Sequence, residues 1–335
     1  MYSLTNLNFS MKGFISKDLH PFWVLLLLLA FMTAGMFVAY FVFSLLVTWV
    51  FGISILEFAT IAENPASNPQ GANMMLLMQG VLQFFSFVVA PLVLLRSFGY
   101  NLDTYLNWKV KPSALLLLLS GLLIVVLMPA NSMVIDWNAK LELPEFMKGF
   151  AEWARAKEDE MAELTKLIAD FSTVPKLLVG LVVVAVIPAI GEELVFRGIL
   201  QRQVHRWFNN THVAIWVAAI VFSSIHMQFF GFVPRMVLGA MFGYLYFWSG
   251  RMIVPIIAHF VNNGFTVFLL YLQQTGRIDF DVESTEAMPW IWVIISLLLT
   301  AGVLYYLYQQ FSPLPVRQAS IAEAESGIRR DEEEL

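Results

Sequence analysis

Long apolar runs separated by short polar segments dominate the pattern of this chain. Such runs, which lack a period-two alternation, predict helices rather than the strands of a membrane barrel. A helix needs about 20 mostly apolar residues to cross a bilayer. We therefore expect an all-α, polytopic membrane bundle of about eight transmembrane helices, near 22–50, 74–95, 113–130, 175–200, 212–229, 233–249, 252–272 and 289–310.

Polar segments divide this pattern into five regions. They predict about three N-terminal spans (1–130), an amphipathic extramembrane helical segment (131–174), a helical core (175–272), a last loop and span (273–311) and a disordered charged tail (312–335). For the extramembrane segment we expect a cap that packs on the bundle or lies at the lipid headgroups, rather than a lid over a substrate.

The composition agrees with a membrane protein. The chain of 335 residues is 59% hydrophobic and 13% charged, whereas soluble domains are about 25% charged. Residues 21–56 carry no charge, a run far longer than the roughly 7–15 residues of a signal-peptide core, so we expect a retained first span. The Lys and Arg bias of the short loops predicts that both termini are cytoplasmic, in the plasma (inner) membrane if the host is bacterial.

Several chemistries have no support in the sequence. The chain has no cysteine, which excludes disulfides, thiolate metal ligands and a cysteine nucleophile. Its net charge is −5 without a basic patch, and it has no GxGxxG or GxxxxGK[ST] motif. We therefore expect neither nucleic acid nor a nucleotide as a partner.

Three ionisable residues interrupt the apolar run "VAVIPAIGEELVFRGILQRQ" within two helical turns, namely Glu192, Glu193 and Arg197, and Arg202 marks the expected cytoplasmic end of this span. Such residues inside a membrane face the bundle interior or a wet cavity and are functional candidates. Glu193 and Arg197 are spaced i,i+4 and can pair, whereas Glu192 is rotated by about 100° and can point into the bundle. Pro188 cannot donate to the carbonyl of Val184, so we expect a bend there. A buried ion pair that only stabilises the bundle is the alternative for Glu193 and Arg197.

Later predicted helices add two imidazoles and an amide. His226 follows Phe222 by one turn on the same face of its predicted helix, and His259 and Asn263 share a face at i,i+4 spacing. A lone histidine on an apolar helix is more often a core residue than a functional one. Together with Glu192, however, these side chains supply a general base, a water-orienting group and neutral donors for an oxyanion. This set suits the attack of water on an amide carbonyl, and we expect it to converge around a hydrated hollow.

Three short motifs resemble those of a known family. "EELVFR" at 192–197 fits EExxxR, "FSSIH" at 222–226 fits FxxxH, and "HFVNN" at 259–263 fits HxxxN. In this order they are similar to the CAAX protease and bacteriocin-processing (CPBP) family of intramembrane proteases, which includes the Rce1-type endoproteases. The resemblance covers about 175–272.

The resemblance implies a role for each matched residue. Glu192 would activate the attacking water and His226 would help to hold it. His259 and Asn263 would stabilise the oxyanion. Glu193 and Arg197 would support the site. The expected function is an intramembrane endopeptidase that acts on a membrane-associated peptide or protein in contact with membrane lipid.

The cofactor and two other functions stay open at this point. A catalytic zinc takes three protein ligands, and Glu192, His226 and His259 could supply them, although we favour a metal-free glutamate mechanism. The chain could instead be a non-catalytic membrane partner or a bacteriocin-immunity protein. An ion- or proton-coupled transporter is less favoured, because the first half has no intramembrane ionisable residue to mirror Glu192.

Overall fold

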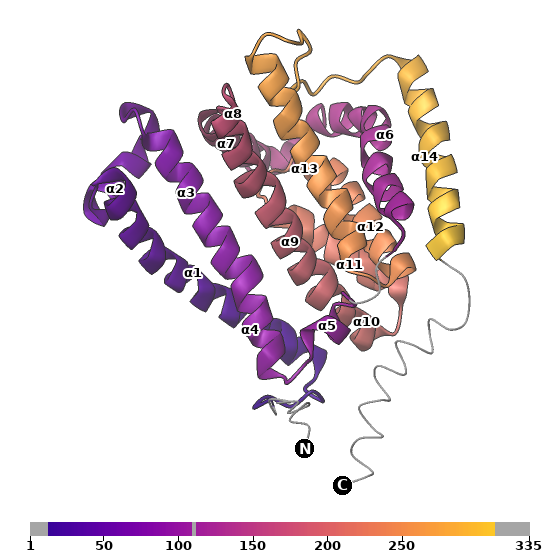
Figure 1. Ribbon diagram of the computed structural model, residues 1–335. Coiled ribbons are helices and arrows are strands. Elements are labelled where there is room, and N and C mark those ends of the chain that lie inside the picture. Colours follow the sequence, from indigo (N-terminus) through magenta and orange to yellow (C-terminus); the bar gives the residue numbers. More distant parts are fainter. Residues whose placement is uncertain (1–12, 109–111, 312–335) are drawn as a thin grey trace, which may run out of the picture.

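The computed structural model describes residues 13–108 and 112–311 (Figure 1). Within these ranges every regular element is helical, so the expected all-α fold class is confirmed. The predicted tail at 312–335 lies outside the described residues. In chain order the elements, with η1 and η3 as 3₁₀ turns and η2, η4 and η5 as π-helical segments, are α1 (Pro21–Phe51), α2 (Ile55–Glu63), η1 (Pro65–Ser67), α3 (Gly71–Gln83), η2 (Phe84–Val89), α4 (Ala90–Ser97), α5 (Leu102–Tyr105), α6 (Ala114–Ala139), η3 (Glu145–Met147), α7 (Lys148–Ile168), α8 (Val174–Gly180), η4 (Leu181–Val186), α9 (Ile187–Glu193), η5 (Leu194–Gln201), α10 (Arg202–Phe208), α11 (Thr211–Ser224), α12 (Phe232–Ser249), α13 (Ile253–Gln274) and α14 (Trp290–Phe311).

Six helical stretches of the described chain are long and apolar enough to cross a membrane, so the predicted count of about eight is not confirmed. The 14-residue helix α11 is apolar but shorter, and it ends at Ser224, before the predicted end of its span at 229. Helix α6 instead runs on to Ala139, past the predicted end at 130, with Pro129 inside it. The six stretches are Pro21–Phe51, Gly71–Ser97, Ala114–Ala139, Val174–Phe208, Ile253–Gln274 and Trp290–Phe311.

Local sequence explains where several of these helices begin and end. Helix α1 starts at Pro21, whose missing N–H costs nothing in a first turn, and it ends at Gly52 with φ 71°. Helix α11 starts after Asn210, whose side-chain oxygen accepts a hydrogen bond from the backbone N–H of Val213. Helix α12 ends at Gly250 with φ 59°, where an L side chain would be strained.

The long helices form a bundle in which the chain from α8 to α10 stands at the centre (Figure 1). Helices α1 and α3 lie on one side of it. On the other side α6 packs against both α13 and α14, and α11 packs against α12. The stretch from α8 to α10 contacts helices from both sides, so groups on it can meet residues from distant parts of the sequence.

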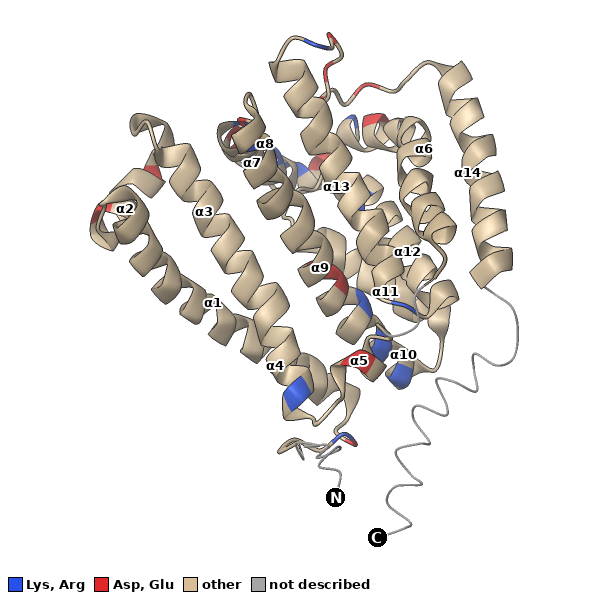
Figure 2. Ribbon diagram, in the orientation of Figure 1, with Lys and Arg blue, Asp and Glu red and all other residues tan. Residues whose placement is uncertain are grey.

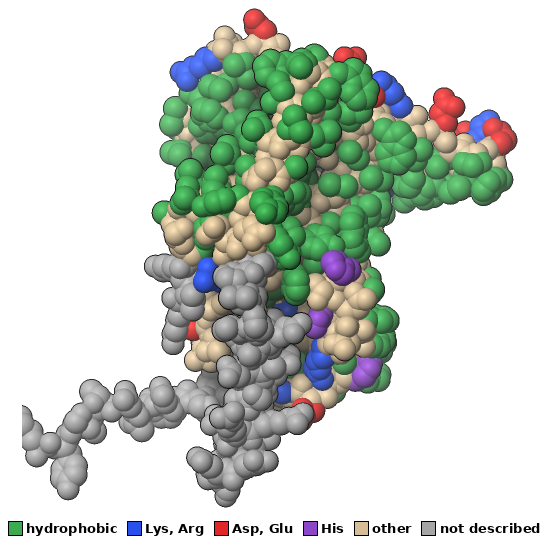
Figure 3. Space-filling view, turned by 90° about the vertical axis from the view of Figure 1, so that its right-hand side faces the viewer, with side chains coloured by type: hydrophobic (Ala, Val, Ile, Leu, Met, Phe, Trp, Pro, Cys, Tyr) green, Lys and Arg blue, Asp and Glu red, His purple; other side chains and the backbone are tan. Residues whose placement is uncertain are grey.

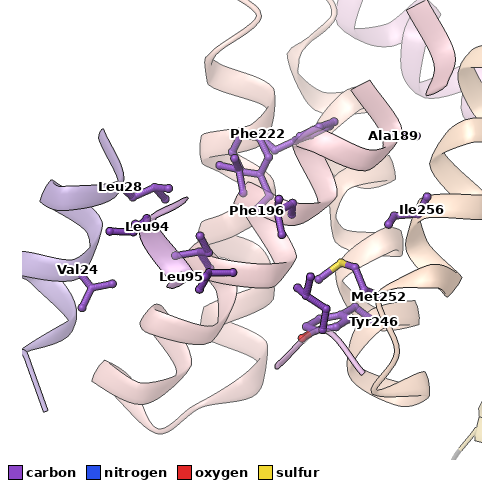
Figure 4. Packing of buried hydrophobic residues seen from close by; sticks show 14 of the residues in the cluster. Val24, Leu28, Leu94, Leu95, Ala189, Phe196, Phe222, Tyr246, Met252 and Ile256 are labelled. Atoms are coloured by element: carbon purple, nitrogen blue, oxygen red, sulfur yellow. The ribbon is translucent and has the colours of Figure 1, made fainter. Parts of the chain in front are cut away.

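A hydrophobic cluster joins the two sides of the bundle (Figure 4). Most of its buried residues come from α1, α4, α9, η5, α11, α12 and α13, so that the helices around the ionisable run are fixed to one another. The residues labelled in the figure are Val24, Leu28, Leu94, Leu95, Ala189, Phe196, Phe222, Tyr246, Met252 and Ile256.

The surface has the character of a membrane protein. Charged residues gather at the two ends of the bundle, and α9 with the adjoining η5 is the place where acidic and basic residues lie nearer its middle (Figure 2). In Figure 3 hydrophobic side chains cover most of the upper part of the visible face, and charged ones lie toward its ends. Large apolar side chains such as Trp49 and Leu298 are exposed by 83% and 69%. The chain is therefore an integral, multi-pass membrane protein.

Candidate active site

Backbone irregularities surround the predicted site. Helix α9 lies between the π-helical segments η4 and η5, a form that is frequent at functional sites. Pro188 leaves the carbonyl of Val184 without its helical donor, and the side-chain amide of Asn263 donates to that oxygen at 3.0 Å. A Cβ at Gly191 would lie 2.8 Å from the Cβ of Phe87, so glycine allows α9 and η2 to approach closely.

Glu193 and Arg197 form the ion pair that their spacing predicts. The Nη1 atom of Arg197 donates to Oε1 of Glu193 at 2.8 Å, and both side chains are fully buried. The second nitrogen, Nη2, donates to the carbonyl of Gly239 in α12 at 2.5 Å. The guanidinium also lies 5.0 Å from the ring of Phe222 and 5.4 Å from that of Phe242. This arginine therefore ties η5 to α12 and neutralises Glu193.

His259 is held in one orientation by its neighbours. Its Nδ1 atom lies 2.8 Å from Oε1 of Glu193. The ring of Phe242 stacks on the imidazole, with centroids 4.9 Å apart and planes at 13°. Because an ionised carboxylate only accepts hydrogen bonds, Nδ1 carries the hydrogen in this contact. The Nε2 atom then faces Glu192, with 3.8 Å between Nε2 and Oε2.

Glu192 receives its hydrogen bond from a part of the chain that the motifs do not cover. Its Oε1 atom accepts from Nε2 of Gln83 at 2.8 Å, and the residue is 6% exposed. Gln83 ends α3, and the sequence analysis missed it. The sequence does contain a pattern that could have indicated Gln83, because Gln79 and Gln83 are spaced i,i+4 within a largely apolar predicted span.

His226 differs from its predicted setting. It does not lie on α11 but in the turn after it, because the helix ends at Ser224 and Met227 takes a φ of 55°. Its Nδ1 atom lies 2.8 Å from the carbonyl oxygen of Phe222. Among the described residues no hydrogen bond links His226 to the two glutamates. The ring of Phe222 makes edge contacts with both His226, at 5.3 Å, and His259, at 5.9 Å.

Asn263 is turned toward the bend of the central helix. Besides its bond to Val184, its side-chain oxygen accepts from Nδ2 of Asn262 at 3.0 Å. The structure thus brings Glu192, Glu193, Arg197 and His259 into one buried cluster. Asn263 stands one turn further along α13, and His226 reaches the cluster through an aromatic ring.

The donor set does not match a zinc site. In the part of the chain that the structure describes, no group of three or more His, Asp or Glu side chains is arranged to hold a metal ion. The three candidate ligands named from the sequence are therefore not gathered around one point.

Comparisons with known proteins concern the same part of the chain. Residues 174–265 match the family model Rce1-like, described as type II CAAX prenyl endopeptidase Rce1-like. The uncharacterized protein YpbD of Bacillus subtilis (strain 168) is 29% identical over 104 residues, which cover 29% of this chain and 50% of that protein. The match thus spans about half the length of this relative. No solved structure matches. The resemblance that the three motifs indicated is confirmed, because residues 174–265 are similar to the Rce1-like family.

Proposed function

We propose that this chain is an intramembrane endopeptidase that hydrolyses a peptide bond of a membrane-associated protein or peptide. The observation that carries the proposal is the pair of free atoms at the centre of the cluster. Oε2 of Glu192 and Nε2 of His259 face each other at 3.8 Å. Their other polar atoms are held by Gln83 and Glu193. A separation of 3.8 Å is too long for a direct hydrogen bond, which leaves both atoms available to a water molecule and a substrate.

In this mechanism Glu192 is the general base. Its carboxylate takes a proton from water as the water oxygen attacks the carbonyl carbon of the substrate. The bond between this carbon and the amide nitrogen then breaks, and the proton passes from Glu192 to the leaving nitrogen. The amide donor of Gln83 favours the carboxylate over the carboxylic acid, as this step requires.

His259 and Asn263 would stabilise the oxyanion of the substrate, and His226 would hold the attacking water. With Nδ1 of His259 on Glu193, the Nε2 edge of the ring would face the developing oxyanion. Asn263 uses one amide hydrogen on Val184 and has a second available. His226 keeps Nε2 free to hold the attacking water, since Nδ1 contacts the Phe222 carbonyl.

Glu193 and Arg197 are positioning residues in this scheme. They contact His259 and α12 rather than the place where the reacting atoms would lie. We propose that water is activated by the glutamate alone, since the ligands that zinc would need are not gathered. The protein would work with both termini in the cytoplasm, in the inner membrane of a bacterial host.

The test compares the wild-type protein with Glu192→Gln. Each protein is reconstituted in lipid nanodiscs with a library of quenched peptides, and cleavage is read by fluorescence and mass spectrometry. We expect the variant to lose at least 100-fold in kcat, the scale of general-base catalysis, which is about 10²–10⁴-fold. Glu163→Gln makes the same change at an exposed position in α7 and is the matched control.

To find the natural substrate, membrane peptides are compared between cells that express the wild-type protein and cells that express Glu192→Gln. Membrane peptides that appear with the wild-type protein and not with Glu192→Gln identify the cleaved bond. Equal peptide patterns and equal library cleavage in the two proteins would contradict the proposal and favour a non-catalytic membrane partner.

A further inference from the structure

Helix α7 separates an apolar edge from a charged face, and the proposed mechanism uses neither. The apolar edge consists of three aromatic residues of η3 and α7, Phe146, Phe150 and Trp153, which are exposed by 87%, 40% and 46%. At about 100° per residue, Asp159 stands about 180° from Phe150, on the charged face. Ala154, on a third side, is buried. An exposed apolar edge opposite a charged face is typical of helices that lie in the plane of a membrane surface.

The neighbours of α7 place it at one end of the bundle. In the chain it lies between two stretches that are long and apolar enough to cross a membrane, one formed by α6 and the next beginning with α8. In space it meets the turn at 225–231, between α11 and α12, which carries His226 and is here called the His226 turn. The ring of Phe150 packs edge-on against that of Phe229 in this turn, with centroids 5.3 Å apart.

Polar contacts fasten α7 to the same turn. The Oε2 atom of Glu158 accepts a hydrogen bond from the backbone N–H of Phe230 at 3.0 Å. The guanidinium of Arg155 lies 3.5 Å from the centroid of the Phe230 ring, and its Nη2 atom donates to the carbonyl of Ala139 at 3.1 Å. Helix α7 is therefore fixed both to the end of α6 and to the His226 turn.

The length of α11 indicates how deep the His226 turn lies. Its 14 residues are about 21 Å long at about 1.5 Å per residue, whereas the hydrocarbon core of a bilayer is about 30 Å thick. The helix begins next to α10, at the opposite end of the bundle from α7 (Figure 1), so the turn lies about 9 Å short of the second surface of this core. A helix in a membrane surface buries its apolar face by about 5–10 Å. A helix at that depth fills the space above α11.

The aromatic edge of α7 also continues into an exposed apolar surface of α11. Ile225 and Met227 in the His226 turn are exposed, as are Ile220 and Val221 near the end of α11, and α7 reaches this surface through its contact with Phe229. Figure 3 shows an arm that projects to the right near the upper end of the bundle, with charged side chains above and hydrophobic ones beneath, as expected for α7. One apolar surface thus runs from α11 to the aromatic edge.

We propose that α7 docks on the lipid surface through its aromatic edge and from there holds the His226 turn in place. The partner is the headgroup layer of the membrane, because aromatic side chains favour that layer while the charged face opposite them stays in water. Lipid on the aromatic edge fixes the height of α7, and Glu158 and Arg155 pass this position on to the turn. The inference goes beyond the proposed peptidase function, since it requires no bond to be cut.

The experiment makes use of a sequence that contains no cysteine. One cysteine at a time is introduced, as Trp153→Cys or Asp159→Cys, and is given a nitroxide spin label in the full-length protein in phosphatidylcholine nanodiscs. Collisions of the label with oxygen, which concentrates in lipid, are compared with collisions with a water-soluble nickel chelate. We expect oxygen to dominate at position 153 and the nickel chelate to dominate at position 159.

A third label, at Met227→Cys, reports the motion of the His226 turn. Removing the aromatic edge with Phe146→Ser/Trp153→Ser should release α7 and shift part of the spectrum of this label to a mobile component. Glu152→Ser/Asp159→Ser changes two exposed side chains of the charged face instead. This matched control should leave the spectrum unchanged.

Glu158→Leu tests the link between α7 and the turn separately from lipid. It removes the acceptor of the Phe230 N–H and leaves the aromatic edge intact. The label at position 227 should become more mobile in this variant, while the label at position 153 keeps its preference for oxygen. If the serine pair at 146 and 153 does not fold, Glu158→Leu still decides whether α7 holds the turn.

Three results would overturn the inference. Dominance of the nickel chelate at both label positions on α7 would place the helix in water. A label at position 153 that neither reagent reaches would show that a second copy of the chain or another protein covers the aromatic edge. An unchanged label at position 227 in Glu158→Leu would show that α7 does not hold the turn. None of these readouts depends on catalysis, so equal cleavage by the wild-type protein and Glu192→Gln would overturn the proposed peptidase alone.

Discussion

Replacing Gln83 with leucine tests whether Glu192 acts as the base. Gln83 is the hydrogen-bond donor that the structure gives to this carboxylate, at 2.8 Å. A hydrogen bond to a charged group contributes about 1.5–3 kcal/mol, and each 1.36 kcal/mol is about tenfold in rate. If the bond holds Glu192 ionised and aligned, Gln83→Leu should lower kcat by about 10- to 150-fold with little change in KM.

The effect of this substitution on stability should be much smaller than its effect on rate. Leucine leaves Oε1 of Glu192 without its donor, which is unfavourable. It also removes Oε1 of Gln83, a buried oxygen that has no partner within the described chain, and an unsatisfied buried group costs about 1–3 kcal/mol. The two terms oppose each other, so the midpoint of thermal unfolding should change little while activity falls.

Gln79→Leu provides the matched control for this measurement. Gln79 lies one turn earlier on α3 and makes no side-chain hydrogen bond within the described structure. Both variants and the wild-type protein are compared in nanodiscs for kcat, KM and unfolding midpoint. A loss of less than threefold in Gln83→Leu, or an equal loss in Gln79→Leu, would refute the idea that this amide prepares the base.

Three further predictions concern the rest of the cluster. Arg197→Met leaves Glu193 buried without its cation and should lower the free energy of unfolding by about 3–5 kcal/mol, as measured by denaturant titration. The double variant Glu193→Gln/Arg197→Met should recover most of this loss. A loss below about 1 kcal/mol in Arg197→Met would contradict the pairing. Asn263→Ala removes the donor to the carbonyl of Val184 and should cost about 1–3 kcal/mol as well as lower kcat, whereas a purely catalytic role would leave the unfolding midpoint unchanged. Incubation with a strong zinc chelator followed by its removal should leave peptide cleavage within twofold, and a loss restored by added zinc would show that the metal-free mechanism is wrong.

The sequence alone predicts the contacts that spacing within one helix determines. The pairing of Glu193 with Arg197 follows from i,i+4 geometry, and the structure has it. The separate setting of Glu192 follows from the rotation of about 100° per residue. The contact of Asn263 with Val184 was beyond this kind of reasoning, although the freed carbonyl was predicted, because the answering donor comes from another helix.

The prediction that His226 lies within a membrane-spanning helix was wrong for a related reason. An apolar run does not reveal where a helix ends inside it, and the expected span at 212–229 continued through a turn. In the structure the chain leaves the helix after Ser224, and the hydroxyl of Ser223 donates to the carbonyl of Phe232 at 2.6 Å. Hydropathy averages over such a turn because Ile225, Met227 and Phe229 are as apolar as the helix itself.

The contact between Gln83 and Glu192 also bears on which part of the chain forms the site. The family match begins at residue 174, and the motifs begin at Glu192. Yet the hydrogen-bond donor to Glu192 lies 109 positions earlier in the sequence, and the close approach of Gly191 to Phe87 brings that segment near. A buried carboxylate without a donor would favour its neutral form, which cannot take a proton from water. In the proposed mechanism the N-terminal spans therefore do more than anchor the chain, because α3 and η2 would complete the environment in which Glu192 acts as the base.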